Sequence, residues 1–333
     1  MTRRMMTILH PRSMMMTTAP EPLFDQRMHF SGEQEFYRGK VRDVHTLNDG
    51  RLLMVASDRI SAFDVVLPRP IPFKGQVLNQ LAGHMLNAVS ELVPIWLEAT
   101  PDPNVAVGKC CEPIRLEMVI RGHLTGHAWR TYRDGGRMLC GVPLPEGMRE
   151  HDAFDAPIIT PATKAEEGHD EDISEAQILS SGLVDEKLYQ EMARVTRALF
   201  ARGQAMASSR GLILVDTKYE FGMYEGQLML MDEVHTPDSS RYFHAEGFED
   251  RQSRGEQQPQ LSKEFVREWL ISGGFMGRDG DEVPEMTDAF LAEVSQRYIA
   301  LYEQMTGMPF SKPEEVDTAS RIKRNIENWR RAH

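Results

Sequence analysis

Charged side chains alternate with apolar ones in the segment from residue 212 to residue 222. After four apolar residues, Asp216, Lys218 and Glu220 follow at two-residue spacing. Alternate side chains of a β-strand lie on one face, so the three charges would point the same way while Tyr219 and Phe221 pack on the other face. Two carboxylates beside an ammonium suit a magnesium ion and a phosphorylated substrate. A solvent-exposed strand would show the same alternation, so these charges alone leave both interpretations open.

A second apolar segment, residues 228–231, follows a turn at 223–226 and ends at Asp232 and Glu233. This pattern predicts a β-hairpin that brings further carboxylates back beside the first three charges. A shift of one residue in the pairing would turn Asp232 to the other face. Oxygen ligands from two paired strands suit magnesium. The turn-rich loop that follows ends at Arg241, which could bind a phosphate or a carboxylate through two N–H groups.

The strands that must position these charges are preceded by a second hairpin near the N-terminus. A strand over 36–44, a turn at 48–50 and an apolar strand over 52–56 are expected. Such a hairpin can lie over a nucleotide, with Gly39 allowing close backbone approach and Lys40 supplying charge. The sequence contains neither a Walker A motif nor G-x-G-x-x-G, so it supports neither a P-loop nor a Rossmann site.

The rest of the chain alternates helices and loops. Apolar spacing predicts helices over 74–92, 185–209, 262–271 (with Ser262 as cap) and 284–305 (with a proline start), the last of these being the final helix. An apolar strand over 116–120 leads into Arg121, which would be costly to bury without an anionic partner. Residues 133–162 form a long connection that could contain a hairpin, and the basic segment 321–324 is expected on the surface.

The composition is that of an ordinary globular enzyme. The chain has 333 residues, of which 41% are hydrophobic and 26% charged, enough for one large or two medium domains. A net charge of -12 argues against a nucleic-acid partner, although a local cluster of Lys and Arg can still bind a small phosphorylated molecule. No apolar run approaches the ~20 residues that a membrane span requires.

Cysteine usage and the N-terminus point to the cytoplasm. Cys110, Cys111 and Cys140 show no C-x-x-C spacing, which argues against zinc and against a disulfide framework. The first twenty residues contain many methionines but no continuous apolar core, so we interpret them as an extension outside the fold rather than a secretory signal.

Five stretches occur in an order that resembles one known family. They are YRGKVRDV at 37–44, SDRISAFD at 57–64, RGHLTG at 121–126, TKAEEGHDEDIS at 163–174, and LILVDTKYEFG at 212–222 with the MDE and TPDSSRYF that follow it. This pattern is similar to the SAICAR synthetase (phosphoribosylaminoimidazole-succinocarboxamide synthase) family over roughly residues 30 to 270. Any one of the motifs would be weak, whereas five in order are specific.

The resemblance implies a fold and a reaction. The fold would be α+β and two-lobed: an extension over 1–20, a small β-rich lobe covering ATP over 21–114, and a larger mixed-sheet lobe with helices over 115–333. The reaction would be an ATP-dependent ligation, a step of purine biosynthesis, that joins the carboxyl of carboxyaminoimidazole ribotide to the amine of L-aspartate. A monomer is favoured. The alternatives are a small-molecule kinase, which would ignore aspartate, and a nucleotide-binding module without turnover.

The resemblance also implies roles for particular residues, with ATP and Mg²⁺ as cofactors. Lys218 and Asp216 would be catalytic, Asp216 either orienting Lys218 or accepting a proton from the amine. Glu220 and Asp232 would hold the metal. The residues expected at ATP are Gly39, Lys40, Arg42 and Glu117. Those expected at the ribotide and aspartate are Ser57, Asp58, Arg59, Ser61, Asp64, Arg121, Lys164, His169, Asp170, Glu171, Ser240 and Arg241.

The sequence departs from the family pattern at three places. His127 stands where the family usually has a serine that would contact substrate. The acidic loop around His169 is one residue shorter than the family's. Residues 261–264, Leu-Ser-Lys-Glu, replace the usual start of the following helix, although Lys263 and Arg267 remain.

Overall fold

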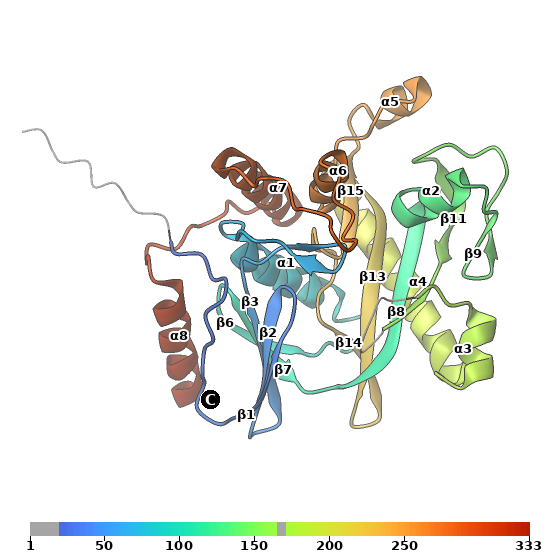
Figure 1. The fold of residues 1–333 in the computed structure, drawn as a ribbon. Helices are drawn as coiled ribbons and strands as arrows, with labels where there is room; N and C mark the ends of the chain where they lie inside the picture. The colour runs from blue at the N-terminus through green and yellow to red at the C-terminus, as the bar shows by residue number, and fades with distance from the viewer. Residues whose placement is uncertain (1–19, 165–170) are drawn as a thin grey trace, which may run out of the picture.

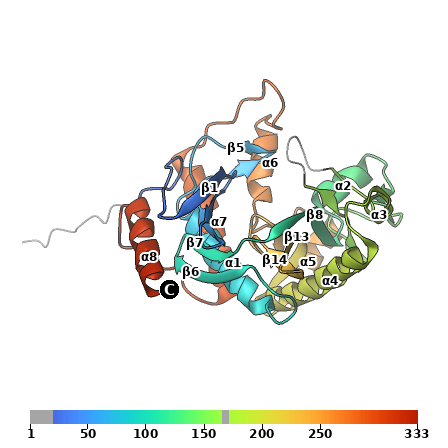
Figure 2. The ribbon, with the colours of Figure 1, turned by 90° about the horizontal axis from the view of Figure 1, so that it is seen from below.

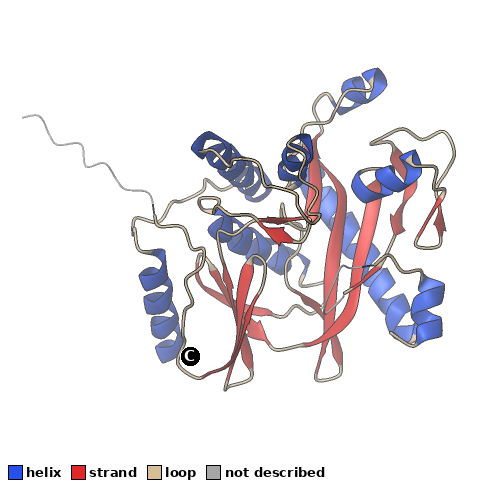
Figure 3. Cartoon of the chain, in the orientation of Figure 1, coloured by secondary structure: helices blue, strands red, loops and turns tan. Residues whose placement is uncertain are grey.

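The computed structural model describes residues 20–164 and 171–333 and shows two large β-sheets and two short two-stranded ones, flanked by helices (Figures 1 and 3). Of the predicted extension over 1–20, residues 1–19 lie outside the described residues. The first sheet has the order β1 (Glu33–Arg38), β2 (Arg42–Leu47), β3 (Arg51–Ala56), β7 (Val105–Lys109) and β6 (Leu97–Asp102). A short ribbon of β4 (Ser61–Ala62) and β5 (Val65–Val66) follows β3 in the chain.

The strand expected over 36–44 is in fact two strands, because the chain turns at Gly39. The Gly39 amide donates to the Arg42 carbonyl at 2.8 Å. A Cβ atom on Gly39 would lie 2.6 Å from that carbonyl, so only glycine allows so tight a turn. The break places Lys40 in the turn between β1 and β2, while the expected turn at 48–50 joins β2 to β3.

The second sheet carries the predicted C-terminal hairpin. Its order is β11 (Ala153–Ile159), β8 (Glu112–His123), β13 (Leu212–Tyr224) and β14 (Gln227–Met231), with β12 (Ala162–Thr163) also on β8 and β15 (Ser240–His244) also on β13. Glu220 pairs with Met231, and the connecting turn has positive φ at Glu225 and Gly226. A mixed sheet was expected, but the ladders among these described strands are antiparallel, since β13 is joined to β14 by a hairpin and lies between β8 and β15.

The connection over 133–162 contains a small hairpin of β9 (Met138–Leu139) and β10 (Val142–Pro143) before β11. Around it lie three helices for which no range was predicted. These are α2 (Gly126–Arg133), α3 (Glu175–Ser181), which begins with a Ser174 capping box, and α5 (Phe248–Arg254).

Two of the predicted helices form closely as expected, and two begin later. They are α1 (Lys74–Val89), α4 (Glu186–Ser208), α6 (Glu264–Ser272) and α7 (Asp288–Thr306). Asp185 caps α4, which packs along β13 and β8 (Figure 2). The proline start expected for α7 is wrong: Thr287 caps the helix through the Phe290 amide. Lys263, rather than Ser262, precedes α6.

A further helix, α8 (Thr318–Ala332), corrects two expectations about the C-terminus. It follows the helix predicted to be the final one, and it packs against β6 of the first sheet (Figures 1 and 2). Ile322 and Ile326 complete an apolar cluster with residues of the N-terminal segment, β3 and β7. Arg321, expected on the surface, is buried because its guanidinium bonds both carboxylate oxygens of Asp102 (3.0 and 3.1 Å).

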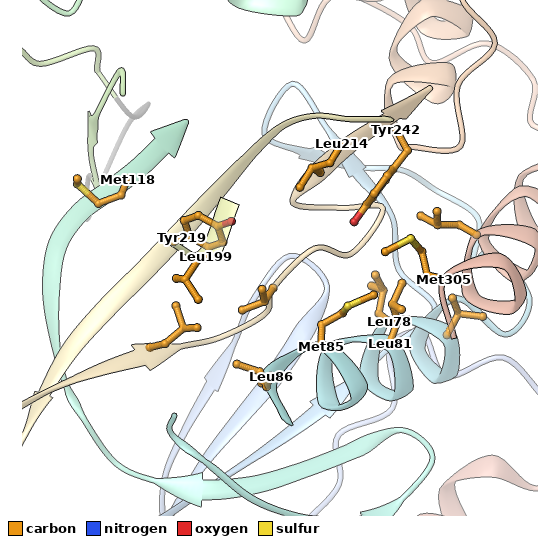
Figure 4. Close-up of a cluster of buried hydrophobic side chains, with 14 of the residues drawn as sticks. Leu78, Leu81, Met85, Leu86, Met118, Leu199, Leu214, Tyr219, Tyr242 and Met305 are labelled. Carbon is orange, nitrogen blue, oxygen red and sulfur yellow. The ribbon is translucent and has the colours of Figure 1, made fainter. Parts of the chain in front are cut away.

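The main apolar core connects the two sheets. Leu81 and Met85 of α1 lie close to Met305 of α7, and Tyr219 of β13 belongs to the same cluster (Figure 4). The fold is therefore α+β and two-lobed, with the predicted boundary near residue 114 falling inside β8. No helix among the described residues has the length and apolarity that a membrane crossing would need.

Candidate active site

The predicted row of charges on β13 exists and is extended by β8. Asp216, Lys218 and Glu220 share one face, while Tyr219 and Phe221 are fully buried on the other. The β8 register sets Arg121 opposite Asp216 and Glu117 opposite Glu220. Directly opposed residues of an antiparallel pair present their side chains on the same face. Two adjacent strands therefore build one charged surface, with arginine at one end and carboxylates at the other.

Lys218 lies at the centre of the carboxylate end. Its ammonium donates to Glu117 Oε1 at 2.5 Å and to Glu220 Oε1 at 3.2 Å, and Lys164 also pairs with Glu220. Burial by itself would lower the pKa of Lys218, but Glu220 and Glu117 raise it well above its ordinary value. Burial would raise the pKa of Glu220, yet Lys218 and Lys164 lower it to about 2. Near neutral pH the ammonium and the carboxylate are both charged.

Asp232 joins this end from the turn after β14. The residue has φ +54°, and its carbonyl accepts from the Trp96 indole at 3.0 Å. Arg42 of β2 reaches across from the first sheet and pairs with Asp232 at 3.4 Å and with Glu233. Burial raises the pKa of Asp232 to about 6, and Glu220 and Glu233 act in the same direction while Arg42 opposes them.

These carboxylates fit magnesium in number and kind. Among the described residues no group of three or more His, Cys, Asp or Glu side chains has a metal-binding arrangement. Glu220 and Asp232 are two oxygen donors that influence each other electrostatically across the hairpin. Magnesium prefers one or two protein carboxylates, with substrate phosphates and water completing its coordination shell. The donor set therefore suits a metal that arrives with a nucleotide.

The other end of the row carries two arginines that share one carboxylate. Arg241 Nη1 donates to Asp216 Oδ2 at 2.6 Å, and Arg121 Nη1 lies 3.5 Å from the same oxygen. Arg121 Nε also donates to Thr160 Oγ1 at 2.8 Å. The buried Nε of Arg241 has no acceptor among the described residues. A buried, unsatisfied guanidinium donor is costly, which favours an anionic ligand at this position.

The start of α2 lies against the same guanidinium. Gly126, the first residue of α2, has φ +57°, and a Cβ atom there would lie 2.4 Å from Arg241 Nη2. No side chain caps this helix end through a hydrogen bond. Its backbone N–H groups therefore add to the positive character of the site.

Glu264 is the common carboxylate partner of the arginines at this end. It was not predicted as a site residue. Its carboxylate accepts from Arg241 at 2.9 Å and from Arg267 at 3.1 Å, and Arg130 approaches to 4.0 Å. The only sequence signal for Glu264 was that it lies in the stretch 261–264, which departs from the family pattern. Glu233, a partner of Arg42, was expected among the carboxylates that the hairpin brings back, but it was given no role.

Two predicted residues of the 57–64 segment, Ser57 and Arg59, support the turn that carries Lys40. Arg59 donates to the Gly39 and Lys40 carbonyls (3.1 and 3.3 Å) and to Asp43 (2.5 Å), and Ser57 Oγ donates to the Val41 carbonyl (2.8 Å). Every one of these contacts is with the turn or the strand after it. Ser57 and Arg59 therefore support this turn through its backbone carbonyls.

Asp58, Asp64 and Ser61 lie in different surroundings. The Asp58 carboxylate accepts from the Leu23 and Gly75 amides at 2.8 and 2.9 Å, and it lines a cavity of about 300 Å³ together with Arg321. Burial raises the pKa of Asp58 to about 6. Asp64 is exposed and pairs with Lys40 at 2.5 Å. Ser61 is buried in β4.

Ser240 and Glu171 are described by the structure, whereas two other predicted residues are not. Ser240 is buried and donates to Thr217 Oγ1 at 2.8 Å, so it supports β13 from β15. Glu171 is exposed, and its backbone pairs with Thr163. His127 forms a 2.6 Å contact with Asp172, a partner that was not predicted. His169 and Asp170 lie outside the described residues.

Comparison with known proteins gives one consistent result. The profile of the family described as SAICAR synthetase matches residues 35–279. The chain is 56% identical over 302 residues to phosphoribosylaminoimidazole-succinocarboxamide synthase of Cytophaga hutchinsonii, covering 91% of this chain and 97% of that protein. The enzyme of the same name from Bacteroides thetaiotaomicron is 55% identical, with 90% and 96% covered. The solved structure of SAICAR-synthase from Saccharomyces cerevisiae complexed with SAICAR superposes with a TM-score of 0.73 at 32% identity, covering 86% of this chain and 99% of that one.

Proposed function

This chain belongs to the SAICAR synthetase family, and we propose from that membership how its charged row performs the reaction. The protein is an ATP-dependent carbon–nitrogen ligase of purine biosynthesis that joins the carboxyl of carboxyaminoimidazole ribotide to the amine of L-aspartate, releasing ADP and phosphate. The observation that carries the residue roles is the shared face of β13 and β8, which holds Lys218 between two carboxylates and ends at Arg121.

The reaction needs an activated carboxyl group. A ribotide carboxylate oxygen attacks the γ-phosphorus of ATP, the bond to the ADP oxygen breaks, and an acyl phosphate forms. The aspartate nitrogen then attacks the acyl carbon, the carbon–oxygen bond to phosphate breaks, and the nitrogen loses a proton. Both steps depend mainly on positioning and charge neutralisation.

At the carboxylate end, Lys218 neutralises negative charge on the transferring phosphoryl group. Glu117 and Glu220 hold its ammonium in place, so Glu117 acts here as an orienting group for Lys218. Glu220 and Asp232 would hold magnesium, which when bound would offset the negative charge of the nucleotide phosphates. Arg42 and the turn at Gly39 and Lys40 contact the phosphates from the first sheet.

At the arginine end, Arg121 and Arg241 bind the ribotide phosphate together with the start of α2. Asp216 accepts from both guanidinium groups through one oxygen, which favours a role in positioning these arginines over a role as a base. The proton of the attacking amine then has to leave by another route. The cations of the row thus divide between two anions, the nucleotide phosphates at Lys218 and the ribotide phosphate at Arg121.

The protein is further proposed to act in the cytoplasm as a monomer on small molecules. The three cysteines are free thiols, which suits a reducing compartment. Size-exclusion chromatography with light scattering would check the monomer directly.

The role of Lys218 is tested by the Lys218→Met variant, with Lys187→Met, an exposed lysine of α4, as the matched control. Loss of one preorganised charge contact lowers turnover by about a hundred- to thousandfold. Release of ADP and phosphate would be measured with ribotide and aspartate, each also omitted in turn. Turnover of Lys218→Met within tenfold of the parent would refute the assignment, and ADP release without aspartate would support a kinase.

A further inference from the structure

Lys263 is a half-buried cation beside the active site that has no carboxylate of its own. It immediately precedes α6, and its amide donates to the Pro237 carbonyl at 3.0 Å, which fixes it to the loop between β14 and β15. Among the described residues its ammonium makes no ion pair within 4.0 Å, in contrast to the neighbouring Lys74, which lies 2.9 Å from Asp238.

The carboxylates around Lys263 are already engaged. Asp238 accepts from Lys74 and, at 2.5 Å, from the Tyr298 hydroxyl. Glu264 is shared by Arg241, Arg267 and Arg130, and Glu233 pairs with Arg42. Burial lowers the pKa of Lys263 to about 8, and Asp238 only partly offsets that effect. An ammonium in this position gains a strong interaction only when a ligand brings an anion.

On this side of the site, cations outnumber the carboxylates that pair with them. Five cations, Arg121, Arg241, Arg130, Arg267 and Lys74, share the carboxylates of Asp216, Glu264 and Asp238 within 4.0 Å, and among the described residues Lys263 pairs with none. A phosphate at Arg121 and Arg241 accounts for part of the excess. Lys263 lies on the side of this cluster towards Glu233 and Asp238, which influence it electrostatically, and Glu233 pairs with the nucleotide-facing Arg42. Lys263 can therefore accept an anion that a ligand brings to this part of the site.

We infer that Lys263 and Arg267 bind the carboxylates of L-aspartate. The inference rests on the proposed function, because the amine must reach the acyl carbon between the two phosphate sites. Lys263 and Arg267 are four residues apart at the start of α6, a spacing that places side chains on one side of a helix. Arg267 uses Nη1 for Glu264 and keeps other donors for a ligand. A dicarboxylic amino acid can engage both cations while its amine remains free.

The test uses the Lys263→Met variant with two nucleophiles. Hydroxylamine has no carboxylate, so it can trap the acyl phosphate without the aspartate pocket. The KM for L-aspartate should rise at least tenfold, whereas the KM values for ribotide and ATP and the rate of hydroxamate formation should stay within twofold of the parent. Lys263→Arg should restore most of the affinity for aspartate, and Lys187→Met should change nothing.

Stability separates this role from a structural one. An unpaired, half-buried ammonium does not stabilise the fold, so Lys263→Met should melt at the same temperature as the parent or higher. A lower melting temperature, an increased KM for ribotide, or an equal loss with both nucleophiles would overturn the inference. Lys218→Met distinguishes a failure of the proposed function from a failure of this inference. It should abolish the reaction with hydroxylamine as well as with aspartate.

Discussion

His235 makes the stability of the loop between β14 and β15 depend on pH. The side chain is fully buried, and its Nε2 lies 2.7 Å from the Tyr219 hydroxyl. Its Nδ1 has no partner among the described residues. Burial lowers the pKa of His235 to about 3, far below the ordinary 6.5. The same loop connects Asp232 to Arg241, so a charge on His235 would disturb both ends of the active site.

The sign and size of the effect follow from linkage. Because the folded pKa lies below the unfolded value, the unfolded chain binds the proton first as the pH falls. The stabilisation is complete well above pH 6.5 and is lost progressively between about pH 6.5 and pH 3. At pH 5, about 1.5 units below the unfolded pKa, the loss is ~2 kcal/mol, taken at about 1.36 kcal/mol per unit.

Urea denaturation at pH 7.5 and pH 5.0 measures this loss. His235 has φ +57°, which asparagine tolerates, so His235→Asn is the least disruptive replacement. That variant should be less stable at pH 7.5 but should lose ~2 kcal/mol less than the parent on acidification. The other buried histidines are common to both proteins and cancel in the comparison. His29→Asn, at an exposed histidine, is the control. Equal losses in parent and His235→Asn would refute the reasoning.

Two further predictions concern the arginines. Gly126→Ala should push Arg241 away, since a Cβ atom would lie 2.4 Å from its Nη2, and should raise the KM for ribotide at least tenfold in steady-state assays. An unchanged KM would mean that Arg241 does not bind the ribotide. Asp102→Asn should weaken the buried pair with Arg321 and lower the urea-derived free energy of unfolding by about 3 kcal/mol. Asp49→Asn, which removes a more exposed pair with Arg51, should lower it by less than about 1 kcal/mol, and equal losses would contradict the role of burial.

The sequence predicted the parts of the site that depend on local periodicity. The alternation from Asp216 to Glu220 required a strand, and the apolar segment at 228–231 required a hairpin. The pattern also separated the buried Tyr219 from the charged face. These features are encoded within about twenty residues, so a single chain segment contains all the information needed.

Features that depend on distant partners were not predicted. Glu264 is buried only because Arg241 and Arg267 surround it, and no local pattern reveals that arrangement. From the sequence, Arg321 is expected on the surface, because its buried partner Asp102 lies more than two hundred residues earlier in the chain. The strand break at Gly39 was missed because a single glycine between Arg38 and Lys40 does not by itself mark a turn, and only the tight approach to the Arg42 carbonyl shows it.

The position of α8 has a consequence for synthesis of the protein. The apolar cluster of the first sheet contains Leu23 and Leu53, which leave the ribosome early, and Ile322 and Ile326, which follow every described strand in the chain. The Thr318 hydroxyl also donates to the Glu21 carbonyl at 2.8 Å. The nascent N-terminal sheet therefore keeps one side uncovered until α8 has been synthesised. During this interval the partly made chain offers a hydrophobic surface to chaperones, and a premature stop codon before residue 318 would leave that surface permanently exposed.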